Sequence, residues 1–297
     1  MPAASVREIA GPKAGARLRA VMAMVLATLL WGGTFLVTRD ALPHVGVAAL
    51  LLARFGGATL LLSAALFARR RRFTRETLLP GLACGPFIAL CCVLQTGGLR
   101  ETSAGSSAFL TCAGTLSAPF FAWAMIRERP SAAVFAGMAL ALVGSALLSW
   151  RPELGVGRAE LLTFLGAMAY AFQLVIVARV APRVDVLALT AAQLLGVTLC
   201  LLPFADLRSA AALFAAPALG WRVLYLTLGG TVIAPLLQVD AQRTLPTGRI
   251  ALLFALEPVF ALVIAALFGG ERFLAQWWVG AALILCAMLV AEWTSAR

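Results

Sequence analysis

The sequence predicts an all-α integral membrane protein, in which ten transmembrane helices form two inverted five-helix repeats around a central cavity. The first observation is composition: 62% of the 297 residues are hydrophobic and 12% are charged, against about 45–50% and about 25% in soluble domains. The second is a series of apolar runs, each close to the roughly 20 residues that a membrane-crossing helix needs. The third is an internal similarity between the two halves of the chain. Together they exclude a soluble enzyme, a disordered chain and a secreted disulfide scaffold.

The apolar runs fill most of the chain, and their short connections contain Pro or Gly, as turns do. We expect transmembrane helices at 20–38, 47–67, 78–99, 104–126, 131–149, 158–180, 187–204, 219–242, 248–268 and 274–293. The first five-helix unit is then 20–150 and the second 158–293. A basic N-terminus of residues 1–19 precedes them, and a C-terminus of residues 294–297 follows.

The net charge of +11 lies in the connections and not in a nucleic-acid-binding module, so we exclude nucleic acid as a partner. With the N-terminus in the cytoplasm, sixteen Lys and Arg residues fall on the cytoplasmic side and seven on the other. The positive-inside rule therefore predicts that both termini are cytoplasmic. The run Arg69–Arg72 is placed beside anionic lipid head groups.

The two halves align with each other at two nearly equal shifts. Residues 43–62 match 182–201 at ten of twenty positions under a shift of 139, and the shift becomes 143 after a four-residue insertion. The matched pairs include Gly57/Gly196, Thr59/Thr198, Gly105/Gly248, Glu128-Arg129/Glu271-Arg272, Gly137/Gly280 and Trp150/Trp293. Because each unit has an odd number of spans, the second copy is upside down in the membrane. Inverted repeats of this kind are typical of secondary transporters.

Arg54 and Glu257 are the charges deepest in apolar sequence, roughly 10 and 13 Å from the ends of their runs at 1.5 Å per residue. Charges at such depth are costly unless they are paired or face a polar cavity. Two interpretations stay open. In one, Glu257 is a proton site and Arg54 binds a substrate carboxylate. In the other, the two form a fixed pair, or the carboxylate bonds to the backbone near Pro258.

Aromatic and amide side chains inside the runs predict a cavity for a small, partly apolar solute. Trp31 and Phe35 lie in the first run, and Tyr170, the repeat partner of Trp31, lies with Gln173 in the sixth. The other cavity candidates are Arg54, Gln95, Ser107, Thr111, Gln193, Gln238 and Glu257. Helix packing and interfacial anchoring are the alternatives for the aromatic residues. Ser107, Thr111 and Thr115 form a strip at helical spacing, which is either tight packing or a cavity wall.

Prolines inside four runs predict hinges, because an interior proline removes a backbone hydrogen bond and bends a helix. These hinge candidates are Pro86, Pro119, Pro235 and Pro258. The motif Gly81-x-x-x-Gly85 predicts close helix packing.

Catalysis and metal binding have no support in the sequence. The six cysteines lie in apolar runs without metal spacing, and the lone histidine, His44, lies in a connection. We therefore expect no catalytic residues, no metal and no cofactor. An intramembrane enzyme is a remote alternative, because it would need a base or a carboxylate pair within the runs.

Several motifs in order resemble the drug/metabolite transporter superfamily, in its EamA-type branch of ten-helix carriers. They are Trp31-Gly32-Gly33-Thr34-Phe35, Arg54, Thr102-Ser103-Ala104-Gly105, Ala108-Phe109-Leu110, Leu256-Glu257-Pro258-Val259-Phe260-Ala261 and Gly270-Glu271-Arg272. The resemblance covers about residues 20–293 and implies a bacterial inner-membrane protein that exports metabolites. Thr115 and Arg127 depart from the family pattern, where proline and glycine are usual.

The sequence and this resemblance predict a secondary carrier that works by alternating access. The branch resembles exporters of amino acids, so we expect neutral or aromatic amino acids as substrates. The alternative substrates are drugs or other hydrophobic or cationic small molecules, and a channel is a further alternative. The expected partners are the small-molecule substrate and the lipid bilayer, with the proton as candidate coupling ion; the oligomeric state is not predicted.

Overall fold

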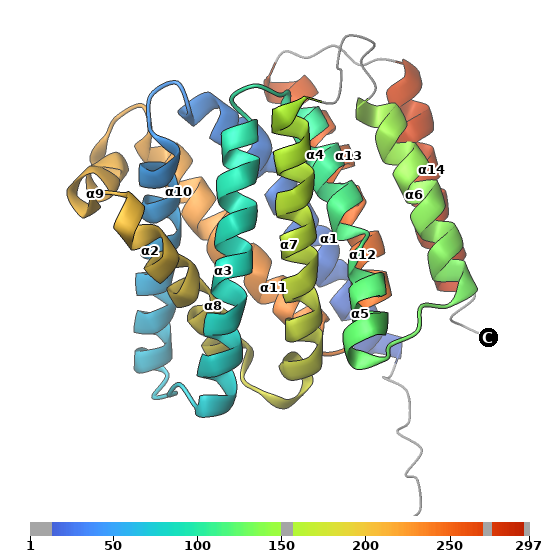
Figure 1. Cartoon of the computed structure of the whole chain (residues 1–297), viewed down its shortest axis with the longest axis horizontal. Coiled ribbons are helices and arrows are strands. Elements are labelled where there is room, and N and C mark those ends of the chain that lie inside the picture. The colour runs from blue at the N-terminus through green and yellow to red at the C-terminus, as the bar shows by residue number, and fades with distance from the viewer. Residues whose placement is uncertain (1–13, 150–156, 270–274, 294–297) are drawn as a thin grey trace, which may run out of the picture.

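The computed structural model describes residues 14–149, 157–269 and 275–293, and these residues form α-helices with no β-strand among them (Figure 1). The helices of the first half are α1 (Ala14–Ala41), α2 (Val47–Ala68), α3 (Arg75–Gly98), α4 (Ala104–Thr115), α5 (Ala118–Ile126) and α6 (Ala132–Ser149). The helices of the second half are α7 (Arg158–Val180), α8 (Val186–Leu201), α9 (Leu207–Ala215), α10 (Gly220–Thr227), α11 (Ala234–Ala241), α12 (Thr247–Phe254), α13 (Leu256–Phe268) and α14 (Ala275–Trp293). Short 3₁₀ turns follow α7 and α8, and a π-helical segment, Leu228–Ile233, joins α10 to α11.

All ten predicted runs are helical where the structure describes them, but three are interrupted. The run 104–126 breaks between α4 and α5, and the run 248–268 breaks at Ala255 between α12 and α13. The run 219–242 holds the π-helical segment. The helix α9 was not predicted, because its nine residues are far too few for a membrane span.

Eight helices of the described chain, counted with their short continuations, are long and apolar enough to cross a membrane. Two more apolar helices, Ala132–Leu147 within α6 and Ala275–Val290 within α14, are shorter. The chain is therefore a multi-pass helical membrane protein, and the full number of ten spans stays a prediction.

Some compared residues fall outside the described part of the chain. They are Trp150, Gly270, Glu271 and Arg272, with the terminal segments 1–13 and 294–297.

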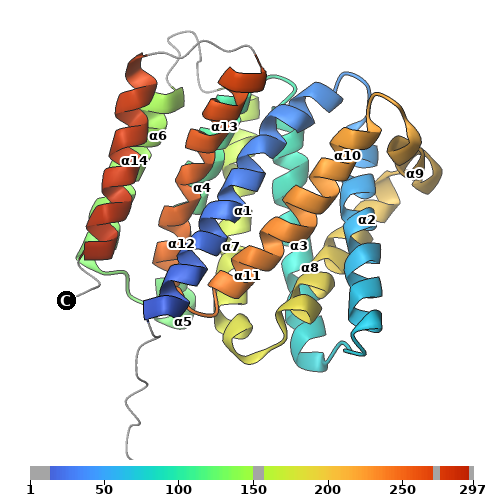
Figure 2. The same cartoon turned by 180° about the vertical axis from the view of Figure 1, so that it is seen from behind.

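The helix connections gather at two opposite ends of the molecule (Figures 1 and 2). At one end the connection after α2 meets the connection after α7, where Arg71 and Asp185 form an ion pair. At the same end the Glu128 carboxylate accepts hydrogen bonds from the backbone N–H and the hydroxyl of Thr247, at 2.8 and 3.0 Å. The connection between α1 and α2 lies at the other end. Because α1 starts at the end where α7 finishes, equivalent helices of the two halves run in opposite directions.

Contacts between α6 and α14 repeat under the shift found in the sequence. A Cβ added at Gly137 would lie 3.0 Å from the carbonyl oxygen of Ala287, and one added at Gly144 would lie 2.7 Å from that of Gly280. A shift of 143 turns Gly137 into Gly280 and Gly144 into Ala287, so each contact is the image of the other. A two-fold relation between the halves explains why both positions hold small residues.

The pair α2 and α8 shows the same relation. The hydroxyl oxygens of Thr59 and Thr198, which are matched under the shift of 139, lie 2.9 Å apart in a hydrogen bond. The predicted close packing of α3 is also present, since a Cβ at Gly85 would lie 2.6 Å from the Cα of Gly196 on α8.

Asp206 directly precedes the short helix α9, and its carboxylate accepts hydrogen bonds from the backbone N–H and the hydroxyl of Ser209, both at 2.8 Å. These bonds hold the pKa of the Asp206 carboxyl below its ordinary value, because they stabilise the charged form. The carboxylate is thus an N-cap for α9.

Candidate functional site

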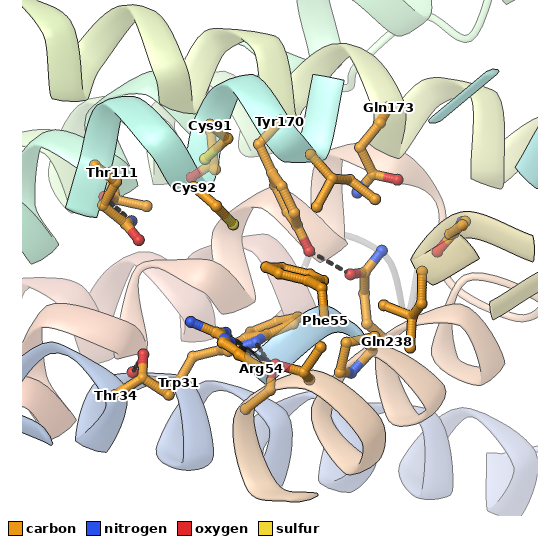
Figure 3. Close-up of a pocket in the computed structure, with 18 of the residues that line it drawn as sticks. Trp31, Thr34, Arg54, Phe55, Cys91, Cys92, Thr111, Tyr170, Gln173 and Gln238 are labelled. Atoms are coloured by element: carbon orange, nitrogen blue, oxygen red, sulfur yellow. Dashed lines mark hydrogen bonds between the residues drawn. The ribbon is translucent and has the colours of Figure 1, made fainter. Parts of the chain in front are cut away.

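A cavity of about 70 Å³ lies among helices of both halves, with room for several water molecules (Figure 3). Nine of the eleven candidate side chains line it: Trp31, Arg54, Gln95, Thr111, Tyr170, Gln173, Gln193, Gln238 and Glu257. They come from α1, α2, α3, α4, α7, α8, α11 and α13, which are separated widely in sequence.

Phe35 and Ser107 are the two candidates that do not line the cavity. Phe35 is 2% exposed and packs in the hydrophobic core. On its helix Trp31 and Thr34 face the cavity instead, because residues three apart share a helix face. Ser107 is fully buried, and its hydroxyl has no hydrogen-bond partner, whereas Thr111 lies one turn later and reaches the cavity.

The structure adds lining residues that the sequence analysis missed. They are Thr34, Phe55, Ile88, Cys91, Cys92, Leu194, Gly230, Thr231 and Phe254, together with the hinge candidate Pro235. Two of them could have been found from the repeat: Thr34 is matched to Gln173 by the shift of 139, and Phe254 to Thr111 by the shift of 143. The others carry no signal that separates them from ordinary residues of apolar helices. Thr115, which shares a polar strip with Ser107 and Thr111, also lines the cavity.

Arg54 is held by the π-helical segment. Its Nε donates to the hydroxyl of Thr231, and its Nη2 donates to the carbonyl oxygen of Gly230 at 3.3 Å. Trp31 Nε1 donates to the same Gly230 oxygen at 2.9 Å. In a π-helix this oxygen would accept from the backbone N–H five residues later, but that residue is Pro235, which has no N–H. The missing bond leaves the oxygen available to both side chains.

Three aromatic rings form one wall of the cavity. Trp31 stacks on Phe254, with centroids 5.2 Å apart and planes 13° from parallel. Tyr170 meets both rings edge-on, at 6.3 Å from Trp31 and 5.9 Å from Phe254. Such rings offer an apolar surface and a negative π-face to a solute.

The hydroxyl of Tyr170 begins a hydrogen-bond chain, the first bond of which is drawn in Figure 3. It donates to Gln238 Oε1 at 2.7 Å. Gln238 Nε2 donates to Gln242 Oε1 at 2.6 Å, and Gln242 Nε2 donates to the carbonyl oxygen of Leu174 at 2.8 Å. The chain fixes Tyr170 and Gln238 in place, so both present ordered polar groups beside the rings.

Glu257 lines the cavity and is 4% exposed. Its Oε2 is buried without a hydrogen-bond partner, and within the described residues it forms no ion pair with Arg54. The structure therefore has neither the fixed pair nor the backbone-bonded carboxylate that the sequence left open. Both charges border the cavity separately.

Three of the four hinge candidates lie at helix interruptions. Pro119 is in the first turn of α5, Pro235 follows the π-helical segment, and Pro258 is in the first turn of α13. Pro86 lies inside the uninterrupted helix α3, and so does Pro80, which the sequence analysis passed over. Bending at any of them stays a prediction.

Among the residues that the structure describes, no group of three or more His, Cys, Asp or Glu side chains is arranged to hold a metal ion.

Comparison with known proteins gives one family and one fold. Residues 18–150 and 157–292 each match the EamA-like transporter family. No curated protein matches the sequence. Among 29 matching chains of solved structures, one described as "Crystal structure of protein" is 20% identical, with a TM-score of 0.74 over 94% of this chain and 98% of that chain. At this identity the likeness shows the fold alone.

Proposed function

This chain belongs to the EamA-like transporter family, and we propose that it is a secondary carrier that exports neutral or aromatic amino acids by alternating access. We place it in the bacterial inner membrane with both termini in the cytoplasm and ten spans, in units of residues 20–150 and 158–293. The observation that carries the proposal is the cavity between the two halves, which holds one cation and one carboxylate that are not paired with each other.

These two charges suit a zwitterion. Arg54 already uses Nε and Nη2 on neutral acceptors, and its remaining N–H groups are suited to a substrate carboxylate. Glu257 Oε2 has no partner and is suited to an ammonium group. A substrate that pairs with both removes the cost of two separate charges in the membrane interior. Phosphorylated solutes fit less well, because a single arginine would face two phosphate charges.

The three aromatic rings support a side chain with an apolar or aromatic surface. Trp31 and Phe254 are stacked and Tyr170 stands edge-on, so a flat side chain adds to an existing aromatic wall.

Glu257 is also the group to which we assign the coupling proton. When the cavity is empty, a proton on this carboxyl group removes an unpaired buried charge. When the ammonium of a substrate arrives, the two positive charges compete for the same oxygen atoms. Competition at one carboxylate couples export of the substrate to movement of a proton in the other direction.

Alternating access is the mechanism we propose for substrate movement. The cavity volume of about 70 Å³ suits a few waters, so we expect the surrounding helices to separate before an amino acid enters. The interruptions between α4 and α5 and between α12 and α13 are the places where we expect the two halves to bend.

A second candidate function is export of cationic drugs. It is favoured by the unpaired carboxylate of Glu257 beside aromatic faces, which together attract organic cations. Arg54 separates the two candidates, since it attracts a carboxylate and repels a cation.

The test is counterflow of labelled L-phenylalanine in liposomes that contain the purified protein. Saturable counterflow supports a carrier, whereas a flux that does not saturate indicates a channel. Arg54→Gln should remove amino-acid counterflow, and Glu257→Gln should remove its dependence on a pH gradient. Arg100→Gln, at an exposed position, is the matched control and should transport normally. Normal transport by both cavity variants would overturn the proposal.

A further inference from the structure

We propose that Gln173 and Gln193 form a second recognition site in the cavity, for an uncharged group that both donates and accepts a hydrogen bond, such as a carboxamide or a hydroxyl. The proposal rests on the proposed function, because it concerns the part of an amino-acid substrate that is distant from its charged groups.

Each of the two amides has a buried atom without a nitrogen or oxygen partner. Gln173 is 1% exposed and Gln193 is 3% exposed, and both line the cavity. Gln173 Oε1 and Gln193 Nε2 are buried and make no hydrogen bond to nitrogen or oxygen; the thiol of Cys84, a weak acceptor, is the group beside the Gln193 amide. The Gln173 oxygen is an acceptor and the Gln193 nitrogen is a donor, so together they can bond a group that both donates and accepts a hydrogen bond. Buried polar groups are nearly always satisfied in folded proteins, which makes two open ones at one cavity informative.

The other cavity amides show that this is not a general property of glutamine in this chain. Gln95 Nε2 donates to the hydroxyl of Thr111 at 2.8 Å. Gln238 both accepts from Tyr170 and donates to Gln242. Among the amides that line this cavity, only those of Gln173 and Gln193 have a fully buried atom without a nitrogen or oxygen partner.

The two amides lie at similar depth from one end of the molecule. Gln173 lies seven residues before the end of α7 at Val180, and Gln193 lies seven residues after the start of α8 at Val186. At 1.5 Å per residue each is roughly 10 Å from the end where these two helices are connected. Arg54 lies seven residues from the start of α2, at the opposite end.

The internal repeat relates the two amides to the charged part of the cavity. The shift of 139 relates Gln193 to Arg54 and Gln173 to Thr34, so the amides occupy the positions that in the first half hold the arginine and its neighbour in the cavity wall. One half thus contributes a charged site and the other half its uncharged counterpart. A substrate that reaches from Arg54 towards α7 and α8 would place its distal group against the amides, past the rings of Trp31 and Tyr170.

L-Glutamine and L-norleucine provide the test, because their charged groups are identical and their side chains have similar length, and only glutamine carries a carboxamide. We would obtain dissociation constants for the purified full-length protein from the ligand dependence of thermal unfolding. The wild type should bind glutamine about tenfold or more tightly than norleucine, since norleucine leaves both amides unsatisfied. Gln173→Leu and Gln193→Leu should bring this ratio close to one.

Thr190→Val is the matched control on α8. Thr190 is fully buried one turn before Gln193 and bonds its own helix at Val186, so its loss should leave the ratio unchanged. Equal binding of the two amino acids by the wild type overturns the amide site and leaves the carrier proposal standing, even if neither leucine variant folds. If no amino acid binds and organic cations do, both the amide site and the amino-acid substrate are overturned.

Discussion

The hydrogen bond between Tyr170 and Gln238 offers a quantitative test of how the cavity is built. Tyr170→Phe removes only the hydroxyl that donates to Gln238 Oε1 at 2.7 Å. Gln238 is 2% exposed, so its oxygen would stay buried without a donor, while its Nε2 keeps the bond to Gln242. Neutral hydrogen bonds between membrane helices contribute about 0.6 kcal/mol on average and at most about 1.7, and an orphaned acceptor adds desolvation cost. We therefore expect a loss of about 1–2 kcal/mol.

Thermal unfolding of the purified protein measures this loss. A change of 1 kcal/mol corresponds to about 2–4 °C in Tm for chains of 150–250 residues, so the variant should melt a few degrees lower. The control is Tyr225→Phe, whose hydroxyl donates to the carbonyl oxygen of Leu30 at 2.8 Å at a half-buried position. Its loss should cost less, because the acceptor is a helix carbonyl.

The double variant Tyr170→Phe with Gln238→Leu completes the cycle. It removes donor and acceptor together, so it should be more stable than the sum of the two single losses predicts. Simple additivity, or an unchanged Tm for Tyr170→Phe, would refute the view that this bond orders the cavity wall.

Three other predictions concern helix packing, capping and surface charge. Gly85→Ala should destabilise the fold by bringing a Cβ within 2.5 Å of the α8 backbone, whereas Gly97→Ala, with nothing within 4 Å, should be tolerated or slightly stabilising, as Tm values would show. Because the pKa of Asp206 is lowered in the folded chain, its cap is complete above the ordinary carboxyl pKa and is lost as pH falls through the lowered value, so protection from hydrogen exchange in the first turn of α9 should decrease once the pH is below the ordinary carboxyl pKa. Arg71→Ala should cost less than about 1 kcal/mol, since the pair with Asp185 is solvent-exposed; Asp185→Ala should cost about 1 kcal/mol more in denaturation measurements, because it also removes the N-cap of α8.

Helix positions could be predicted from the sequence because apolar runs of membrane length leave few alternatives. The interruptions could not be predicted as such. Proline marks three of them, but Pro86 has the same signal and lies within the continuous helix α3. Whether proline breaks a membrane helix depends on neighbouring groups that satisfy the freed backbone atoms, and those groups come from other helices.

The cavity shows the same limit. Polar and aromatic residues in apolar runs could be recognised singly, and nine of the eleven candidates lie together at the cavity. Phe35 was chosen for its ring, yet the helix face that carries Trp31 selects Thr34 instead. The type of residue at Phe254 is typical of a core, so only its match to Thr111 under the repeat marks it, and in the structure its ring stacks on Trp31 at the cavity. The type of a single residue therefore does not predict whether its side chain points into the cavity or towards a neighbouring helix.

The carbonyl oxygen of Gly230 has a mechanical consequence. It belongs to the second half of the chain, yet it accepts hydrogen bonds from Trp31 and Arg54 of the first half. If the π-helical turn tightens by one residue, this oxygen moves by about 1.5 Å along its axis, and an indole and a guanidinium must follow or release it at the same moment. A single backbone atom thus acts as a linkage through which rewinding in one half reshapes the chamber wall supplied by the other.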